Sequence, residues 1–318
     1  KKTQKMRTFY IFLFGLSITS LSSQDIHYSQ FYNSHTFVNP TLFSIQSNDH
    51  TLQLQRRSQW YTVTTPFSTT SFTYGGKNIY KGFSAAITSL NDIAGDSRLS
   101  TSAALISISN KVSINKGVIL YGIQPSFYQQ SINYANLFFL QDEPLKTQSL
   151  SFLDLSLGLS YQNFIDLENS FLLGFSAYHI NKPNQSFSQN NTFLLPVKFN
   201  YYTSIVRKIN SKNILTPSVF YSSQKEAREF IIGCHLNHII NNEIQITTSI
   251  FNRYNDALIF AVGLINKNIK FEASYDVNTS SLRNASNSVG AVEFSISYGW
   301  NKNKKNNKEE QIICPKYL

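Results

Sequence analysis

Four carboxylates lie in stretches of alternating apolar and polar residues, and they are the first candidates for chemistry. They all occupy polar positions of these stretches: Asp154, Glu272, Asp276 and Glu293. Paired carboxylates can act as general acid and base when their surroundings separate their pKa values. Carboxylates are also ordinary lining groups of a water-filled barrel. The lining role is favoured, because no nucleophile is spaced to complete a catalytic arrangement.

Histidines and cysteines form no catalytic or metal-binding pattern. Three of the six His precede the predicted strands, two lie near strand ends, and only His235 shares the parity of a polar face. CxxC and HExxH spacings are missing, so the sequence predicts no enzyme, cofactor or metal site. Cys234 shares the parity of apolar neighbours, whereas Cys314 lies in a polar tail. We expect Cys234 to face lipid and not to form a disulfide with Cys314.

Alternation with a period of two is the main structural signal. Leucines and Tyr161 alternate with polar residues and Gly158 over 153–162, and similar patterns cover 269–277 and 292–300. Such a period places alternate side chains on opposite faces of a strand. About fourteen strands are predicted, near residues 51–61, 67–75, 82–90, 98–109, 117–129, 151–162, 170–180, 198–207, 213–222, 228–239, 243–252, 256–265, 269–277 and 288–300.

Composition fits a barrel that spans a membrane. Charged residues make up only 14% of the 318, aromatic residues another 14%, and the mean hydropathy is −0.21. Strands that turn one apolar face to lipid and one polar face to a lumen give such an average. A secreted sandwich would fit the composition almost as well. The sequence therefore predicts an all-β transmembrane antiparallel barrel, and the connections between strands decide against the sandwich.

The predicted connections sort by length. The even-numbered connections are short, whereas three odd-numbered ones, 130–150, 181–197 and 278–287, are long. Outer-membrane barrels have short periplasmic turns and longer surface loops. We therefore expect an integral outer-membrane protein whose N- and C-termini both lie in the periplasm.

The two ends of the chain differ from the barrel. Residues 1–23 combine basic residues, a short apolar stretch and small residues, as a secretory signal peptide does, with cleavage before Ser23 or Gln24. Residues 24–50 lack alternation and are predicted as a periplasmic lead-in or partial plug, followed by the barrel at 51–300 and a polar periplasmic tail at 301–318. Most of the formal charge of +10 lies in the leader and tail, which disfavours a nucleic-acid partner.

Aromatic placement supports a membrane barrel, with one exception among the charges. Trp60 at the outer end of the first strand, and Tyr298 and Trp300 at the inner end of the last, suit an interfacial girdle. Arg56 shares the parity of apolar residues and would face lipid. Either a bulge shifts the phase before Arg56, or the strand leaves the hydrocarbon early.

A series of short motifs resembles one family in order and spacing. The motifs are QDIHYSQFY at 24–32, NP at 39–40, RSQW at 57–60, NDIAG at 91–95, DLSLGL at 154–159, GFSAYH at 174–179, KPN at 182–184, LP at 195–196, SYD at 274–276, GAVE at 290–293 and the CPKY tail at 314–317. Together they resemble the PorP/SprF family of the type IX secretion and gliding machinery. The sequence departs from the family's pattern at 41–44 and at Val292.

The resemblance implies an outer-membrane barrel beside the type IX translocon. Members of the SprF kind help export or hold a large secreted adhesin through its C-terminal sorting domain, so the implied partners are that adhesin, translocon components and outer-membrane lipid. The alternatives are a channel for small solutes and a barrel hydrolase. The resemblance and the lack of a catalytic arrangement point to partner contact at the lead-in, the outer rim and the lumen; the candidate residues are Asp25, Gln30, Asn39, Pro40, Gln59, Asp92, Asp276 and Glu293.

Overall fold

The alternating sequence folds into fourteen strands preceded by two short helical turns. The computed structural model describes residues 25–59, 66–95, 99–132, 149–166, 168–187, 192–280 and 289–302. The turns are α1 (His35–Val38) and the 3₁₀ turn η1 (Leu42–Ile45). The strands are β1 (His50–Gln59), β2 (Phe67–Tyr80), β3 (Phe83–Ala94), β4 (Leu99–Ile114), β5 (Gly117–Ser131), β6 (Ser149–Phe164), β7 (Ser170–Tyr178), β8 (Lys198–Lys208), β9 (Asn213–Gln224), β10 (Ala227–Ile239), β11 (Ile244–Arg253), β12 (Ala257–Asn266), β13 (Ile269–Asn278) and β14 (Val289–Trp300).

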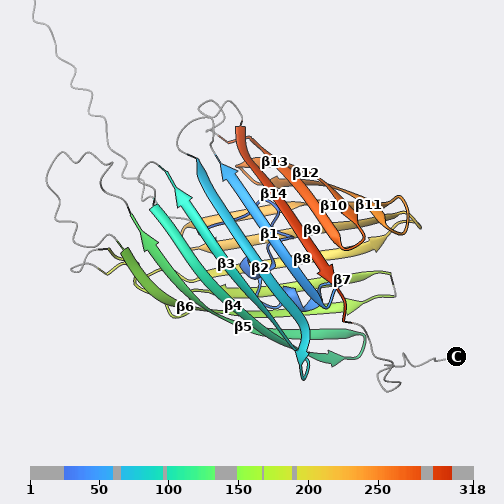
Figure 1. Cartoon of the computed structure of the whole chain (residues 1–318), viewed down its shortest axis with the longest axis horizontal. Coiled ribbons are helices and arrows are strands. Elements are labelled where there is room, and N and C mark those ends of the chain that lie inside the picture. The colour runs from blue at the N-terminus through green and yellow to red at the C-terminus, as the bar shows by residue number, and fades with distance from the viewer. Residues whose placement is uncertain are drawn as a thin grey trace, which may run out of the picture.

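These strands form one closed antiparallel barrel (Figure 1). Each strand pairs with its neighbours in sequence, and β1 closes the ring by pairing with β14 from His50 opposite Trp300 to Gln59 opposite Ala291. Closure leaves no open sheet edge along the body of the wall, which is a condition for a sheet in lipid. The predicted fold and strand number are confirmed.

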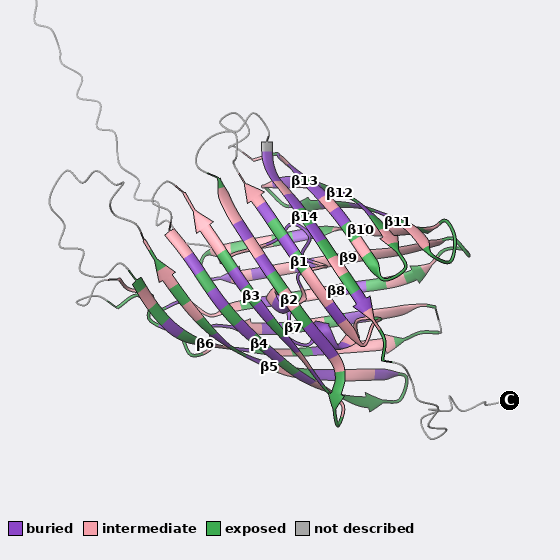
Figure 2. Ribbon diagram, viewed as in Figure 1, coloured by how far each residue is buried: buried purple, intermediate pink, exposed green. Residues whose placement is uncertain are grey.

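Alternation along each strand separates an apolar outer face from an inner face. On β6, Leu153 is 70% exposed, whereas its neighbour Asp154 is 3% exposed and lies inside. Exposed Leu, Ile, Phe and Tyr side chains recur around the outer wall, and buried and exposed bands alternate along the strands in Figure 2. Such an outer face is suited to lipid.

The connections define two unlike mouths. One, here called the short-turn mouth, has the turns 81–82, 115–116, 165–169, 209–212, 240–243 and 267–268. The opposite end, the long-loop mouth, has the connections 60–66, 95–98, 132–148, 179–197, 225–226, 254–256 and 279–288. The predicted sorting of short and long connections to opposite ends is confirmed.

Residues 25–49 pass through the barrel from one mouth to the other; we call them the plug segment. Asp25 contacts His179 and Lys198 at the long-loop mouth, while Asp49 contacts Asn301 and Lys302 at the short-turn mouth. α1 and η1 lie within the ring of strands (Figure 1). The described chain therefore begins at the long-loop mouth and ends at the short-turn mouth. Both termini lie outside the described residues, so their periplasmic location stays a prediction.

Details of the wall settle several smaller predictions. β1 pairs without a bulge on both sides, so Arg56 is exposed on the outer face near the long-loop mouth. Trp300 stacks with His50 and Tyr298 at the short-turn mouth. Trp60, the leader before Asp25 and the tail beyond Lys302, with Cys314, lie outside the described residues.

Cys234 lies on the outer face, as predicted, because its neighbour His235 points inward to Ser249. Within the described ranges, no helix has the length and apolar character needed to cross a membrane.

Candidate functional site

A buried polar cluster joins the start of the plug segment to β1, β13 and β14. The Glu293 carboxylate accepts hydrogen bonds from the main-chain N–H of Ser29 at 2.7 Å and of Gln30 at 3.1 Å. The Gln30 amide donates to the Ser274 hydroxyl at 3.1 Å and to the Glu293 carbonyl at 3.2 Å. Ser29 Oγ also donates to Asp276 at 2.6 Å. The wall therefore binds both the main chain and the side chains of the plug segment.

Two buried arginines complete this cluster. Arg57 lies 3.2 Å from Asp276 and 3.5 Å from Glu293, and Arg253 lies 2.7 Å from Asp276. Both guanidinium groups also donate to Ser29 Oγ. Buried charges are tolerated only when they are paired and hydrogen-bonded. Two arginines facing two carboxylates meet that condition, with Ser29 of the plug segment between them.

A second polar contact fixes the middle of the plug segment. Tyr32 donates its hydroxyl to Glu272, whose other oxygen lies 2.9 Å from Lys270 Nζ. Lys270 Nζ also donates to the Asn33 side chain at 2.9 Å. Glu272 is fully buried, so its charge depends on these partners.

The start of the plug segment is held separately at the long-loop mouth. His179 lies between two carboxylates, with Nε2 2.7 Å from Asp25 and Nδ1 3.0 Å from Asp154, and Lys198 lies 3.6 Å from Asp25. Burial opposes protonation, but the two carboxylates outweigh it and raise the pKa of His179 to about 9. Burial would raise the pKa of Asp25, but His179 and Lys198 lower it below its ordinary range. The contact is therefore ionic at neutral pH.

Apolar packing lies beside the ionic cluster, because Ile259 is paired with Asp276 and Ile231 with Arg253 in neighbouring strands. Phe31, Val38 and Leu42 of the plug segment pack against inward-facing Leu172, Phe220, Ile231, Phe251 and Ile259 of the wall. The Phe31 ring stacks on Phe220 with 5.4 Å between the ring centroids, and it contacts Phe251 edge-on with 5.2 Å between the centroids. The lumen is thus less uniformly polar than the sequence predicts.

Neutral hydrogen bonds hold the second half of the plug segment. The Asn39 amide donates to the carbonyls of Leu159 at 3.1 Å and Phe175 at 2.9 Å. A Cβ on Gly158 would lie 2.2 Å from Asn39 Oδ1 and 2.9 Å from Pro40 Cδ. Asn39-Pro40 therefore needs glycine opposite it, which gives a physical reason for the NP and DLSLGL motifs to occur together.

The structure brings together some predicted residues and separates others. Gln30, Asp276 and Glu293 form one cluster, whereas Asn39 and Pro40 lie across the lumen. Asp25 lies at the long-loop mouth. The two rim residues make only local contacts: Gln59 accepts from Arg57 at 3.5 Å, and Asp92 accepts from Thr69 at 2.5 Å.

Sequence reasoning missed four contributors: Arg57, Arg253, Tyr32 and His179. Arg57 shares the parity of Gln53 and Gln55, so the alternation alone predicts that it points inward. The residue that follows β7, His179, has a φ of 58°, and nothing in the alternation predicts that inward turn. Among the described residues, no group of three or more His, Cys, Asp or Glu is arranged to hold a metal ion.

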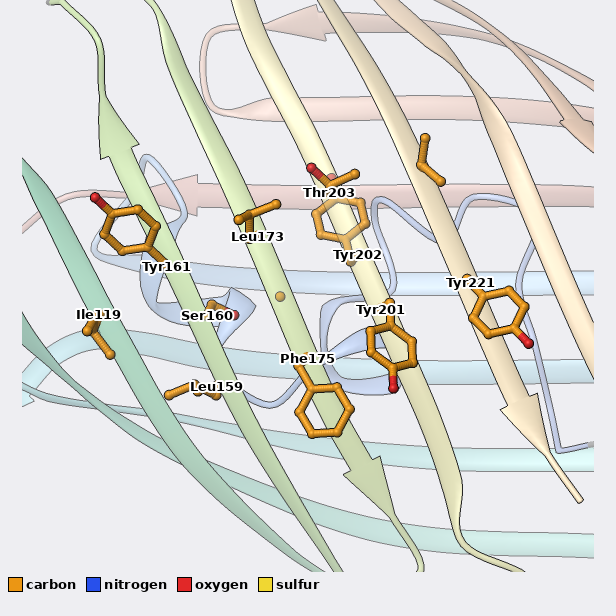
Figure 3. A pocket seen from close by; sticks show the side chains of 12 residues that line it. Ile119, Leu159, Ser160, Tyr161, Leu173, Phe175, Tyr201, Tyr202, Thr203 and Tyr221 are labelled. Carbon is orange, nitrogen blue, oxygen red and sulfur yellow. The ribbon is translucent and has the colours of Figure 1, made fainter.

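A groove of about 480 Å³ lies on the outer wall across β5–β9. Figure 3 shows aromatic and aliphatic side chains around it, among them Tyr161, Leu173, Phe175, Tyr201 and Tyr221. These side chains belong to the outer face, so the groove opens away from the plug segment.

Comparison with known proteins now identifies the family. The family described as "Type IX secretion system membrane protein PorP/SprF" matches residues 20–298, which are most of the chain. The chain belongs to the PorP/SprF family. No curated protein matches it significantly.

Solved structures match the fold of this PorP/SprF protein at low identity. The Ralstonia pickettii toluene transporter TbuX aligns with a TM-score of 0.53 and 9% identity over 83% of this chain and 92% of its own. The Pseudomonas putida toluene transporter TodX aligns with a TM-score of 0.52 and 6% identity over 85% of this chain and 94% of its own. The CymD monoaromatic hydrocarbon channel aligns with a TM-score of 0.50 and 6% identity over 84% of this chain and 92% of its own. At these identities the likenesses concern the fold alone.

Proposed function

We propose that this PorP/SprF protein is an accessory barrel of type IX secretion that docks a large secreted adhesin through its C-terminal sorting domain. The adhesin would be exported or anchored by contact, without a covalent step or cofactor. Family membership supports the secretion role. One observation favours docking over conduction. The plug segment runs through the lumen, and its Ser29, Gln30 and Asn39 are bound to opposite walls.

Deletion of the protein in its native host tests this proposal. The expected result is loss of one large adhesin from the cell surface while the general export of other proteins continues. An Asp276→Ala variant that still reaches the membrane, compared with a rim variant such as Asp92→Ala, shows whether the plug cluster matters for cargo. If all surface proteins remain in place after deletion, the docking proposal fails.

The second candidate is a channel for small solutes. The similar barrels are named as a toluene transporter and a monoaromatic hydrocarbon channel, and the outer groove offers apolar lining. A channel predicts single-channel conductance in a planar bilayer and reduced solute uptake after deletion. The docking proposal predicts that the purified barrel conducts poorly, because the plug segment passes through its lumen and is bound to the wall.

A further inference from the structure

The two mouths carry different charge. At the short-turn mouth, the described basic residues are Lys77, Lys81, Lys111, Lys116, Arg207, Lys208, Lys212, Lys267, Lys270 and Lys302, against the acids Asp49, Asp166, Glu168, Glu243 and Glu272. At the long-loop mouth, the described exposed bases Arg56, Lys182, Lys225 and Arg228 lie among acids such as Glu226, Glu229 and Asp256. Among the described residues, the excess of positive charge is therefore at the short-turn mouth.

The acids of the short-turn mouth are already engaged within the chain. Glu168 pairs with Lys208, and Glu243 pairs with Lys267 at 3.2 Å. Asp166 accepts hydrogen bonds from Asn169. Three turn residues, Lys81, Lys116 and Lys212, are exposed and make no ion pair among the described residues. Their charge is available to a partner.

The β2–β3 and β4–β5 hairpins carry Lys81 and Lys116 away from the wall. The last pair between β3 and β4 is Ser84 with Ser109, so residues 110–114 of β4 pair only with β5. β4 has 16 residues and β5 has 15, whereas a tilted strand needs only about 9–11 to cross the hydrocarbon. The β2–β3 and β4–β5 hairpins extend at the lower end of the barrel in Figures 1 and 2, and their tips are exposed.

The extended hairpins mix basic and apolar side chains. Tyr80 is 66% exposed beside Lys81, and Val112 is 51% exposed beside Lys111. Tyrosine and aliphatic groups surrounded by charge are usual in protein interfaces, where the charges steer the partner and set its orientation.

We infer that the short-turn mouth is a docking surface for an acidic protein in the compartment that this mouth faces, centred on the β2–β3 and β4–β5 hairpins. The surface is independent of cargo bound elsewhere on the barrel. A protein fits better than anionic lipid, because the hairpin tips extend past the length that the hydrocarbon requires.

A charge-reversal series with a photocrosslinker tests the inference in cells of the native host. The crosslinking residue replaces Ile114 in the otherwise unchanged chain and in K81E/K116E/K212E. The matched control is K182E/K225E/R228E at the long-loop mouth. Heat-modifiable gel migration and surface abundance verify that each barrel is assembled. We expect one adduct with an acidic protein, reduced roughly tenfold or more by reversal at the short-turn mouth and unchanged in the control.

Two results would overturn the inference. One is an adduct whose yield does not respond to either triple variant. The other concerns lipid and uses the purified barrel in nanodiscs with and without phosphatidylglycerol. If K81E/K116E/K212E lowers thermal stability only in the anionic discs, and no protein adduct forms in cells, the surface binds lipid headgroups and not a protein.

Discussion

The plug segment is held by two different kinds of contact on opposite sides of the lumen. Around Ser29 and Gln30, the wall offers buried charges, and each depends on its partner. Around Asn39 and Pro40, it offers main-chain carbonyls, glycines and apolar side chains. Ionic contacts fail sharply when one partner is removed, whereas neutral contacts and packing fail gradually. The two sides should therefore differ in how mutation and pH release the segment.

Removal of Asp276 is expected to have the largest effect. Asp276→Ala leaves Arg57 and Arg253 without their shared carboxylate in a buried site, at a cost of about 3–5 kcal/mol. The free energy of unfolding in detergent or lipid measures the loss. Asp276→Asn keeps the shape and removes the charge, and should be nearly as destabilising. A stable Asp276→Ala barrel would mean that the ionic side does not hold the segment.

Overpacking at Gly158 should come next. Gly158→Ala places a methyl group 2.2 Å from Asn39 Oδ1, so the Asn39-Pro40 turn must move, at about 1–3 kcal/mol. Gly174→Ala is the matched control, since its Cβ would meet Asn39 Nδ2 at 3.3 Å. Thermal stability and trypsin access to the plug segment should change more for Gly158→Ala. Equal effects would contradict the close fit seen at Gly158.

Asn39→Ala tests the neutral side through hydrogen bonding. The change leaves the carbonyls of Leu159 and Phe175 without this donor, which costs about 1–3 kcal/mol if no water replaces it. Denaturant unfolding should show a smaller loss than for Asp276→Ala. A larger loss would reverse the proposed ranking of the two sides.

The contact at the long-loop mouth should respond to pH with the smallest effect. The pKa of His179 is raised, so its contribution is full below about 6.5 and is lost as pH rises through about 9. The pKa of Asp25 is lowered, so its contribution is present above about 3.8 and is lost in more acidic solution. Because Asp25 is partly open to solvent, the change should be on the order of 1 kcal/mol. Melting curves at pH 6 and pH 10 should differ less in His179→Asn than in the unchanged chain.

Alternation predicted all fourteen strands and which side chains face inward. Period two is a local property, so strands such as β6 and β14 could be read without knowledge of their partners. The pairing of Arg57 with Asp276 joins residues far apart in the chain, and only closure of the ring between β1 and β14 brings them together. The direction of the plug segment was also beyond prediction, because residues 25–49 carry no alternation and their path depends on contacts with strands far apart in the barrel.

A chain that passes through its own ring also constrains how the barrel can assemble. The Ser29 amide and Gln55 side chain both bind Glu293, and β1 and β14 form the seam that closes the ring. Closing the seam before the plug segment has entered would require threading a free end through a completed cylinder. Seating of the segment and closure of the seam are therefore expected to occur together, as a late step that joins residues at opposite ends of the sequence. Contacts of such separation form slowly, so the energetic barrier to assembly should lie at this seam, and substitutions at Glu293 should slow folding as well as weaken the folded barrel.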